Sequence, residues 1–180
     1  MKIHFLGASG SGTSSIGKRI SQLLQIPFFE SDDIFWENTA IPFTRKRDSD
    51  ERKAMLNDII SENEDWVISG SAMRWGDRLL SASELIVLVT CPTEERIRRL
   101  KIRESSRFGE RILSGNDMHQ NHAAFLKWAS SYDEGGPEMR SLQSERSWLA
   151  QAGCPTMIIE NTVFDRTVDS IILKVKSGRM

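Results

Sequence analysis

The sequence predicts an α/β fold with a parallel sheet covered by helices on both faces. Short, nearly continuous apolar runs alternate with longer segments whose apolar residues recur at helical spacing. A stretch of small residues, "GASGSGTSS", follows the first apolar run and leads into the first helical pattern. The chain has 180 residues, a length that suits one domain with a full core. Residues 1–180 are therefore expected to form a single domain.

Three strands are expected in the first half of the chain. "KIHFLGA" is the first, and an amphipathic helix follows its glycine-rich loop. "IPFFESDD" is the second, and its carboxyl end carries Glu30, Asp32 and Asp33. A helix over about 49–62 then leads to "DWVISGS", a third strand that Gly70 closes.

The second half continues the alternation. "ELIVLVTCP" is the clearest strand, and the helical pattern "TEERIRRLKIRE" begins at Thr93, a possible cap. A polar segment follows it before the last strand, "PTMIIENT", and the final helix, "VFDRTVDSIILKVK". Strands that are apolar throughout are buried on both faces, as in a parallel sheet with helices on either side.

Composition excludes several classes of partner. The formal net charge is -1, from 24 Lys plus Arg against 25 Asp plus Glu, so neither nucleic acid nor an anionic membrane is expected to bind. Cys91 and Cys154 lie in apolar contexts without metal-ligand spacing, which indicates buried free thiols in a reducing compartment. No signal-peptide pattern or membrane-length apolar stretch is visible. We expect a soluble, cytoplasmic protein.

The glycine-rich loop predicts an anion-binding nest. Small residues that feed directly into a helix expose successive backbone N–H groups beside the positive end of the helix dipole. In such a sheet, ligands bind outside the carboxyl ends of the strands, where the acidic residues also lie. The residues expected to bind the phosphates of a nucleotide are Gly7, Ser9, Gly10, Ser11, Gly12, Thr13, Ser14 and Ser15.

Dinucleotide binding is a weaker alternative. The G-x-G-x-x-G fingerprint does not match the spacing of Gly7, Gly10 and Gly12, although carboxylates do follow about 20 residues later. A short-chain dehydrogenase would need a lysine four residues after its catalytic tyrosine. The only tyrosine, Tyr132, has Gly136 at that distance.

These motifs together resemble the adenylate-kinase-like branch of P-loop kinases, which includes nucleoside monophosphate, shikimate and gluconate kinases. "GASGSGTSS" stands where those families have their Walker A loop, and "ESDD" resembles the acidic sequence after their second strand. "ISGS" resembles their substrate-side turn, "RIRRLKIRESSRFGERI" their passage from helix to lid, and "ENT" their adenine-packing segment. The resemblance spans nearly the whole chain. It implies a P-loop NTPase three-layer sandwich with a central parallel sheet and a helical lid at approximately 103–140.

The resemblance also implies ATP and Mg²⁺ as cofactors. Asp32 falls where the family orients or deprotonates the acceptor, and it is also expected to hold Mg²⁺ through water. Ser14 is the preferred hydroxyl for the metal. The lid residues Arg103, Arg107 and Arg111 are spaced four apart and would share one face of a helix, which suits either a clamp on the transferred phosphates or an ordinary solvated face. The acceptor is expected to contact Asp33, Trp36, Gly70, Ser71 and Arg74.

Thr13 is the departure from this pattern, because it occupies the position of the Walker A lysine. Loss of one such contact costs about 3 kcal/mol, or a factor of roughly 10² to 10³ in rate. Lys18, one helical turn after Ser14, is one candidate replacement, with an ordinary solvated lysine as the alternative. The lid arginines are the others.

The sequence therefore predicts ATP-dependent phosphoryl transfer to a nucleotide or another small hydroxylated metabolite, by a monomer or homodimer. A nucleotide-binding regulatory module that has lost transfer together with the lysine is the alternative. A metal site at His119 and His122, with Asp117 nearby, is a weaker idea, since no further ligands have a matching motif.

Overall fold

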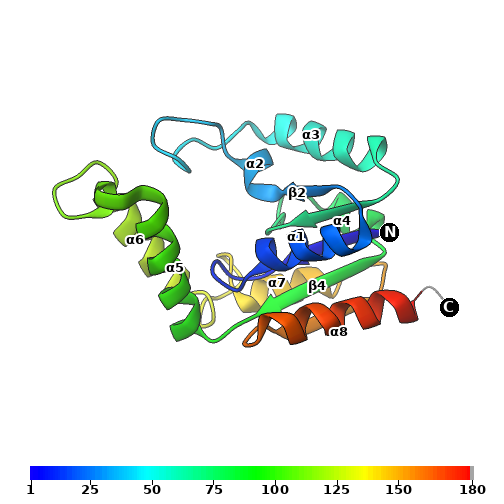
Figure 1. Ribbon diagram of the computed structural model, residues 1–180. Helices are drawn as coiled ribbons and strands as arrows, with labels where there is room; N and C mark the ends of the chain where they lie inside the picture. Colours follow the sequence, from blue (N-terminus) through cyan, green and yellow to red (C-terminus); the bar gives the residue numbers. More distant parts are fainter. Residues whose placement is uncertain (179–180) are drawn as a thin grey trace.

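The computed structural model describes residues 1–178 and contains one sheet of five parallel strands (Figure 1). The strands lie in the order β2-β3-β1-β4-β5. Their register pairs Phe5 of β1 with Ser69 of β3, and Leu6 with Leu88 of β4, so the carboxyl ends of the central strands meet at one edge. The bounds are β1 Lys2–Leu6, β2 Phe28–Glu30, β3 Trp66–Ser69, β4 Leu85–Thr90 and β5 Thr156–Glu160. The predicted α/β class is confirmed.

Helices connect the strands and cover the sheet on both faces. Those of the first half are α1 Thr13–Leu24, α2 Ser31–Phe35, α3 Ser49–Glu62 and α4 Arg78–Ala82. Those of the second half are α5 Thr93–Phe108, the 3₁₀ helix η1 Gly109–Ile112, α6 His119–Ser130, α7 Leu142–Leu149 and α8 Phe164–Ser177.

Two apolar cores separate the three layers. On one face, α1 and α8 pack against the sheet, and Ile16, Ile20 and Ile171 are fully buried there. On the other face, α3, α4 and α7 pack through Leu56, Leu79 and Trp148. Burial of apolar side chains of this kind is the main favourable term in folding. The three-layer arrangement fixes the strand ends at which the glycine loop and the acidic residues lie.

The segment expected as a lid stands away from the sheet. Figure 1 shows α5 and α6 beside each other on one side of the molecule, beyond the carboxyl end of β4. α5 ends at Phe108 and Arg111 lies in η1, so Arg111 does not continue the helical row of Arg103 and Arg107. Pro92 is the residue before α5, and Thr93 makes no capping hydrogen bond.

Two further predictions concern the state of the cysteines and the presence of membrane-spanning segments. Cys91 and Cys154 are both free thiols; Cys91 is buried, whereas Cys154 is only partly buried. None of the helices within residues 1–178 has the length and apolar character that crossing a bilayer requires.

Candidate active site

The loop between β1 and α1 needs glycine for its conformation. Gly10 and Gly12 have φ values of 84° and 99°, which residues with a side chain adopt at a cost. A Cβ atom at Gly10 would lie 2.7 Å from the carbonyl oxygen of Arg96, and one at Gly12 would collide with the side-chain amide of Asn161. The loop therefore wraps tightly in front of α1, whose first-turn N–H groups lack partners within the helix.

Distant parts of the chain brace this loop. The side-chain amide of Asn161, which is 2% exposed, donates to the Ser11 carbonyl at 2.8 Å. The buried Arg96 guanidinium donates to the Ser9 carbonyl at 3.4 Å and to the Ala129 carbonyl at 3.0 Å. These contacts fix the loop to the end of β5, to α5 and to α6. A nest held in this way is preorganised for an anion.

A hydroxyl and a carboxylate meet beside the loop. Ser14 Oγ, in the first turn of α1, donates to Glu30 Oε2 at 3.0 Å. Burial raises the pKa of Glu30 to about 7; the Ser14 bond opposes this, Asp32 and Asp33 add to it, and Lys18 opposes it. Mg²⁺ usually takes one or two oxygen ligands from the protein and completes its shell with water and phosphate. The Ser14–Glu30 pair suits that requirement.

Asp32 follows in the first turn of α2 and lines the main pocket. Solvent reaches its carboxyl group, but the pocket walls remove part of its hydration and so raise its pKa. Arg140, Arg103 and Arg107 oppose this shift in that order, while Asp33 adds to it. Asp32 is thus a carboxylate that faces positive charge on the far side of the pocket.

The main pocket has a volume of about 760 Å³, within the range that small-molecule sites occupy. Its walls come from the glycine loop, α2, the turn after β3, α5 and α6. The aromatic side chains of Phe35, Trp36, Phe43, Trp75 and Trp128 line it. It brings together the following expected site residues: Ser9, Asp32, Trp36, Ser71, Arg74, Arg103 and Arg107.

Other expected residues lie outside this lining. The Lys18 ammonium lies 5.9 Å from the centre of the Phe28 ring, on the β2 side of α1. Arg111 donates to the Asp117 carboxylate and, at 3.3 Å, to the Ala40 carbonyl. Asp33, which is exposed, and Gly70, whose missing Cβ makes room for Ser31, also lie outside it. The same holds for the expected loop residues other than Ser9: Gly7, Gly10, Ser11, Gly12, Thr13, Ser14 and Ser15.

Arg74 and His119 have identifiable structural partners. Arg74 Nη2 donates to the carbonyls of Pro137 and Glu138, at 3.0 and 2.7 Å. His119 Nδ1 lies 3.1 Å from the Ile112 carbonyl oxygen. Within residues 1–178, no group of three His, Cys, Asp or Glu side chains is arranged to hold a metal ion. The metal idea at His119 and His122 therefore gains no support.

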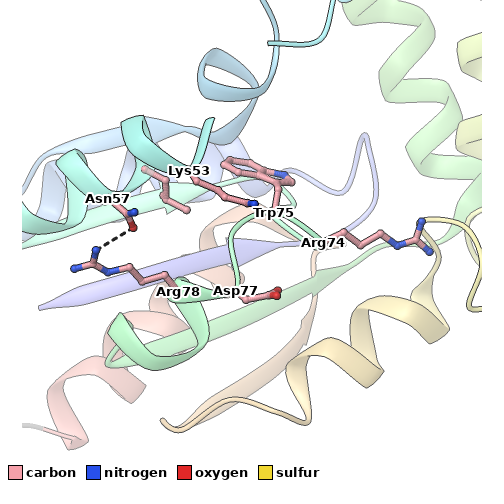
Figure 2. A pocket seen from close by; sticks show the side chains of 7 residues that line it. Lys53, Asn57, Arg74, Trp75, Asp77 and Arg78 are labelled. Atoms are coloured by element: carbon pink, nitrogen blue, oxygen red, sulfur yellow. Dashed lines mark hydrogen bonds between the residues drawn. The ribbon is translucent and has the colours of Figure 1, made fainter. Parts of the chain in front are cut away.

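A second hollow, of about 450 Å³, lies between α3 and the turn before α4. Figure 2 shows its side chains, with Arg78 donating to Asn57 Oδ1 at 2.9 Å and Arg74 extending away from Lys53. Asp77 accepts from the Trp148 indole at 2.8 Å. Its polar groups thus serve mainly as contacts between α3, α4 and α7, and the hollow lies away from the glycine loop.

Four residues of the site were not among those expected from the sequence. Glu30 belongs to the acidic cluster, and its position two residues before Asp32 at the strand end was the available signal. Asn161 lies in the "ENT" motif, where a role in adenine packing was the only expectation. Arg96 and Arg140 carry no local signal, because each reaches the loop from a distant segment.

Comparison with known proteins places this fold and loop in a family. The model of the AAA domain family matches residues 3–122, so the chain belongs to this family of P-loop proteins. The uncharacterized protein YqaC of Bacillus subtilis strain 168 is 38% identical over 172 residues, which cover 93% of this chain and 95% of YqaC.

Solved shikimate kinases share the fold. The enzyme from Acinetobacter baumannii, solved in complex with shikimate, superposes with a TM-score of 0.59 at 16% identity, over 99% of this chain and 94% of that one. The enzyme from Aquifex aeolicus gives a TM-score of 0.55 at 17% identity, over 99% and 98%. The chain thus has the P-loop kinase fold of the nucleotide and shikimate kinase branch.

Proposed function

We propose that this protein is an ATP-dependent kinase that transfers the terminal phosphoryl group to a hydroxyl of a small metabolite or nucleotide. One observation carries the proposal: the phosphate loop, the Ser14–Glu30 pair and Asp32 lie at the carboxyl ends of parallel strands of one sheet, and Ser9 of the loop lines the same pocket as Asp32. A shared fold alone would not assign chemistry. The convergence of an anion nest, a metal-compatible pair and a carboxylate supports phosphoryl transfer.

The loop would hold the nucleotide phosphates through backbone N–H groups between Gly7 and Ser15, other than that of Ser11, which donates to the Ala8 carbonyl. Ser14 and Glu30 would hold Mg²⁺ directly, and Asp32 would hold it through water. When bound, Mg²⁺ neutralises part of the charge on the terminal phosphates. ATP binding and this metal position are both part of the proposal.

Asp32 would act on the acceptor. As the bond forms between the acceptor oxygen and the γ-phosphorus, the bond from that phosphorus to the β-phosphate oxygen breaks and ADP leaves. The acceptor hydroxyl proton passes to the Asp32 carboxylate. A carboxylate whose pKa is raised by its surroundings is a better proton acceptor than an ordinary one.

The pocket walls suggest the class of acceptor. Trp36 and Trp75 offer flat apolar surface, and Arg74, Arg103 and Arg107 offer positive charge. A small ring or carbon skeleton with a hydroxyl and an anionic group fits both. Asp33, Gly70 and Ser71 would shape the entrance, and Arg103 and Arg107 would close over the phosphates. Arg111, which Asp117 holds, would stay outside this closure. We propose that the enzyme works in the cytoplasm as a monomer or homodimer.

A regulatory nucleotide-binding module is the second candidate. Thr13 favours it, because the loop itself lacks the cation that usually stabilises the transferred charge. Asp32 and the arginines on α5 favour the kinase, since binding alone does not require a proton acceptor.

ADP release from Mg-ATP tests the proposal, with nucleoside monophosphates, nucleosides and small hydroxy acids as acceptors. Asp32→Asn keeps the size of the side chain and removes its basicity, so acceptor-stimulated release should fall by about 10² to 10⁴. Asp58→Asn, at an exposed position on α3, is the matched control. Mg-ATP binding without stimulation by any acceptor would favour the regulatory module, and absence of Mg-ATP binding would refute the nucleotide site.

A further inference from the structure

Arg140 lies at the mouth of the glycine loop. Its Nη2 donates to the carbonyl oxygen of Gly7, the first residue of the loop. The backbone of Arg140 is fixed because Ser141, the next residue, is the N-cap of α7 and completes a capping box with Ser144. A segment far along the chain therefore brings a guanidinium to the loop that lacks a lysine.

The guanidinium is held rigidly and stays charged. Arg140 Nε donates to Glu145 Oε1 at 2.9 Å, and the other carboxylate oxygen of Glu145 accepts from the Tyr132 hydroxyl. Glu145 is fully buried. Burial on its own would lower the pKa of Arg140, but Glu145, Tyr132 and Asp32 together outweigh this effect, with Glu145 contributing most, and the pKa is raised.

Part of the guanidinium remains available to a ligand. Arginine has five N–H donors, and Arg140 uses Nε and Nη2 for Glu145 and Gly7. Among residues 1–178, no hydrogen-bond acceptor is found for its Nη1. The side chain is 25% exposed and lines the main pocket together with Asp32, whose carboxylate it influences electrostatically. Arg140 thus keeps unused donors in the pocket that it shares with Ser9 of the loop and with Asp32.

The other basic residues near the loop are less well placed. Arg99 lies near Gly12, but it donates to Glu95 and to the Asn161 carbonyl and does not line the pocket. Lys18 lies over Phe28, outside the pocket. Arg96 is fully buried, and its nitrogens donate to Cys91, Thr93 and Asp133 in addition to the loop. Arg103 and Arg107 line the pocket from α5, and no contact joins either to the loop. Of these side chains, Arg140 alone both touches the loop and lines the pocket.

We propose that Arg140 supplies to the terminal phosphates of ATP the positive charge that a lysine at position 13 would supply. This inference rests on the proposed function and names a catalytic residue for it. The charge comes from the segment before α7 instead of from the loop itself. The Arg140 guanidinium would stabilise the negative charge that develops on the oxygen between the β- and γ-phosphorus while this oxygen leaves with ADP.

Calorimetric titration with Mg-ATP and Mg-ADP tests the inference without knowledge of the acceptor. The proteins are the wild type, Arg140→Met, Thr13→Lys and the double variant. Arg140→Met removes a charged hydrogen bond, so its affinity for Mg-ATP should be about 10- to 100-fold lower than that of the wild type. Its affinity for Mg-ADP should fall by a smaller factor. Thr13→Lys returns a cation to the loop, so the double variant should recover most of the Mg-ATP affinity.

Arg103→Met is the matched control, because it removes a pocket arginine that does not contact the loop. Thr13→Lys should not restore the Mg-ATP affinity that Arg103→Met loses. If Arg140→Met does not unfold cooperatively, Arg140→Lys replaces it in the experiment. A lysine cannot contact Gly7 and Glu145 together, so the affinity for Mg-ATP should fall about tenfold. Thr13→Lys should again reverse this loss.

Two results would overturn the inference. One is Mg-ATP affinity within twofold of the wild type in folded Arg140→Met or Arg140→Lys. The other is a double variant as weak as the Arg140 variant alone. In both cases the wild type binds Mg-ATP, so the nucleotide site of the proposed function stands. A wild type that does not bind Mg-ATP would instead refute the proposed function, and with it the inference.

Discussion

With Glu30 as a ligand of Mg²⁺, as proposed, Mg-ATP binding should depend on pH near neutrality. Its carboxyl group has a pKa of about 7 in the ligand-free protein, against an ordinary value of 4.5. A magnesium ion needs the ionised form. With a pKa of about 7, roughly ten in eleven molecules carry that form at pH 8 and roughly one in eleven at pH 6. The Mg²⁺-dependent part of the ATP affinity should therefore fall about tenfold between pH 8 and pH 6.

Proton release gives a direct measurement of this effect. At pH 7 about half of the Glu30 carboxyls are protonated, so each Mg-ATP bound should release about half a proton. Titration calorimetry at pH 7 in PIPES and in imidazole measures the release, because the two buffers take up protons with different heats. Glu30→Gln is the control: it keeps the side-chain size but has no proton to release. Titration of the nucleotide itself is common to both proteins and cancels in the comparison.

Equal buffer dependence in the wild type and Glu30→Gln would refute this reasoning. It would mean that Glu30 does not change protonation when Mg-ATP binds, and that the metal lies elsewhere. The same raised pKa has a consequence for the ligand-free protein. The folded state holds a proton that the unfolded state releases, so the contribution of Glu30 to stability should decrease as pH rises from 4.5 to about 7.

Three further predictions concern stability and the lid. Burial lowers the pKa of His4 from 6.5 to about 4, so the unfolded state binds a proton first as pH falls. The free energy of unfolding should therefore drop by about 3 kcal/mol between pH 6.5 and pH 4. An identical pH profile for His4→Leu in chemical denaturation would contradict this. Gly12→Ala places a Cβ at φ 99° against Asn161 and should destabilise the protein by about 2–4 kcal/mol, as measured by thermal unfolding. A change below about 0.5 kcal/mol would show that the loop relaxes. Arg103→Ala should lower kcat about tenfold or more. Arg111→Ala should lower kcat less than about threefold, because Asp117 holds the Arg111 guanidinium. The reverse order of these two effects in steady-state assays would place Arg111 on the phosphates.

The fold class was predictable because its signals are local. Each strand is a short apolar run and each helix has its own periodicity, so the pattern can be read within about 15 residues at a time. The glycine loop was predictable for the same reason, because Gly7 to Gly12 and the start of α1 are consecutive in the chain. The acidic cluster after β2 follows directly from its position at a strand end.

The partners of the loop were not predictable in this way. Arg140 reaches Gly7 across 133 residues, and Asn161 reaches Ser11 across 150. Neither contact leaves a trace in local composition, because an arginine or asparagine in a polar segment looks the same whether or not it has a distant partner. Spacing also suggested one row of lid arginines, but the end of α5 at Phe108 separates Arg111 from the other two.

The sequence by itself thus determined the α/β sandwich, the phosphate loop and the absence of a lysine at position 13. The tertiary structure decided which charged groups surround that loop: Glu30 beside Ser14, and Arg140 against Gly7. The physical reason is that backbone conformation and apolar periodicity are encoded among near neighbours. The electrostatic environment of a site is instead a sum over groups that only packing brings within a few ångströms of one another.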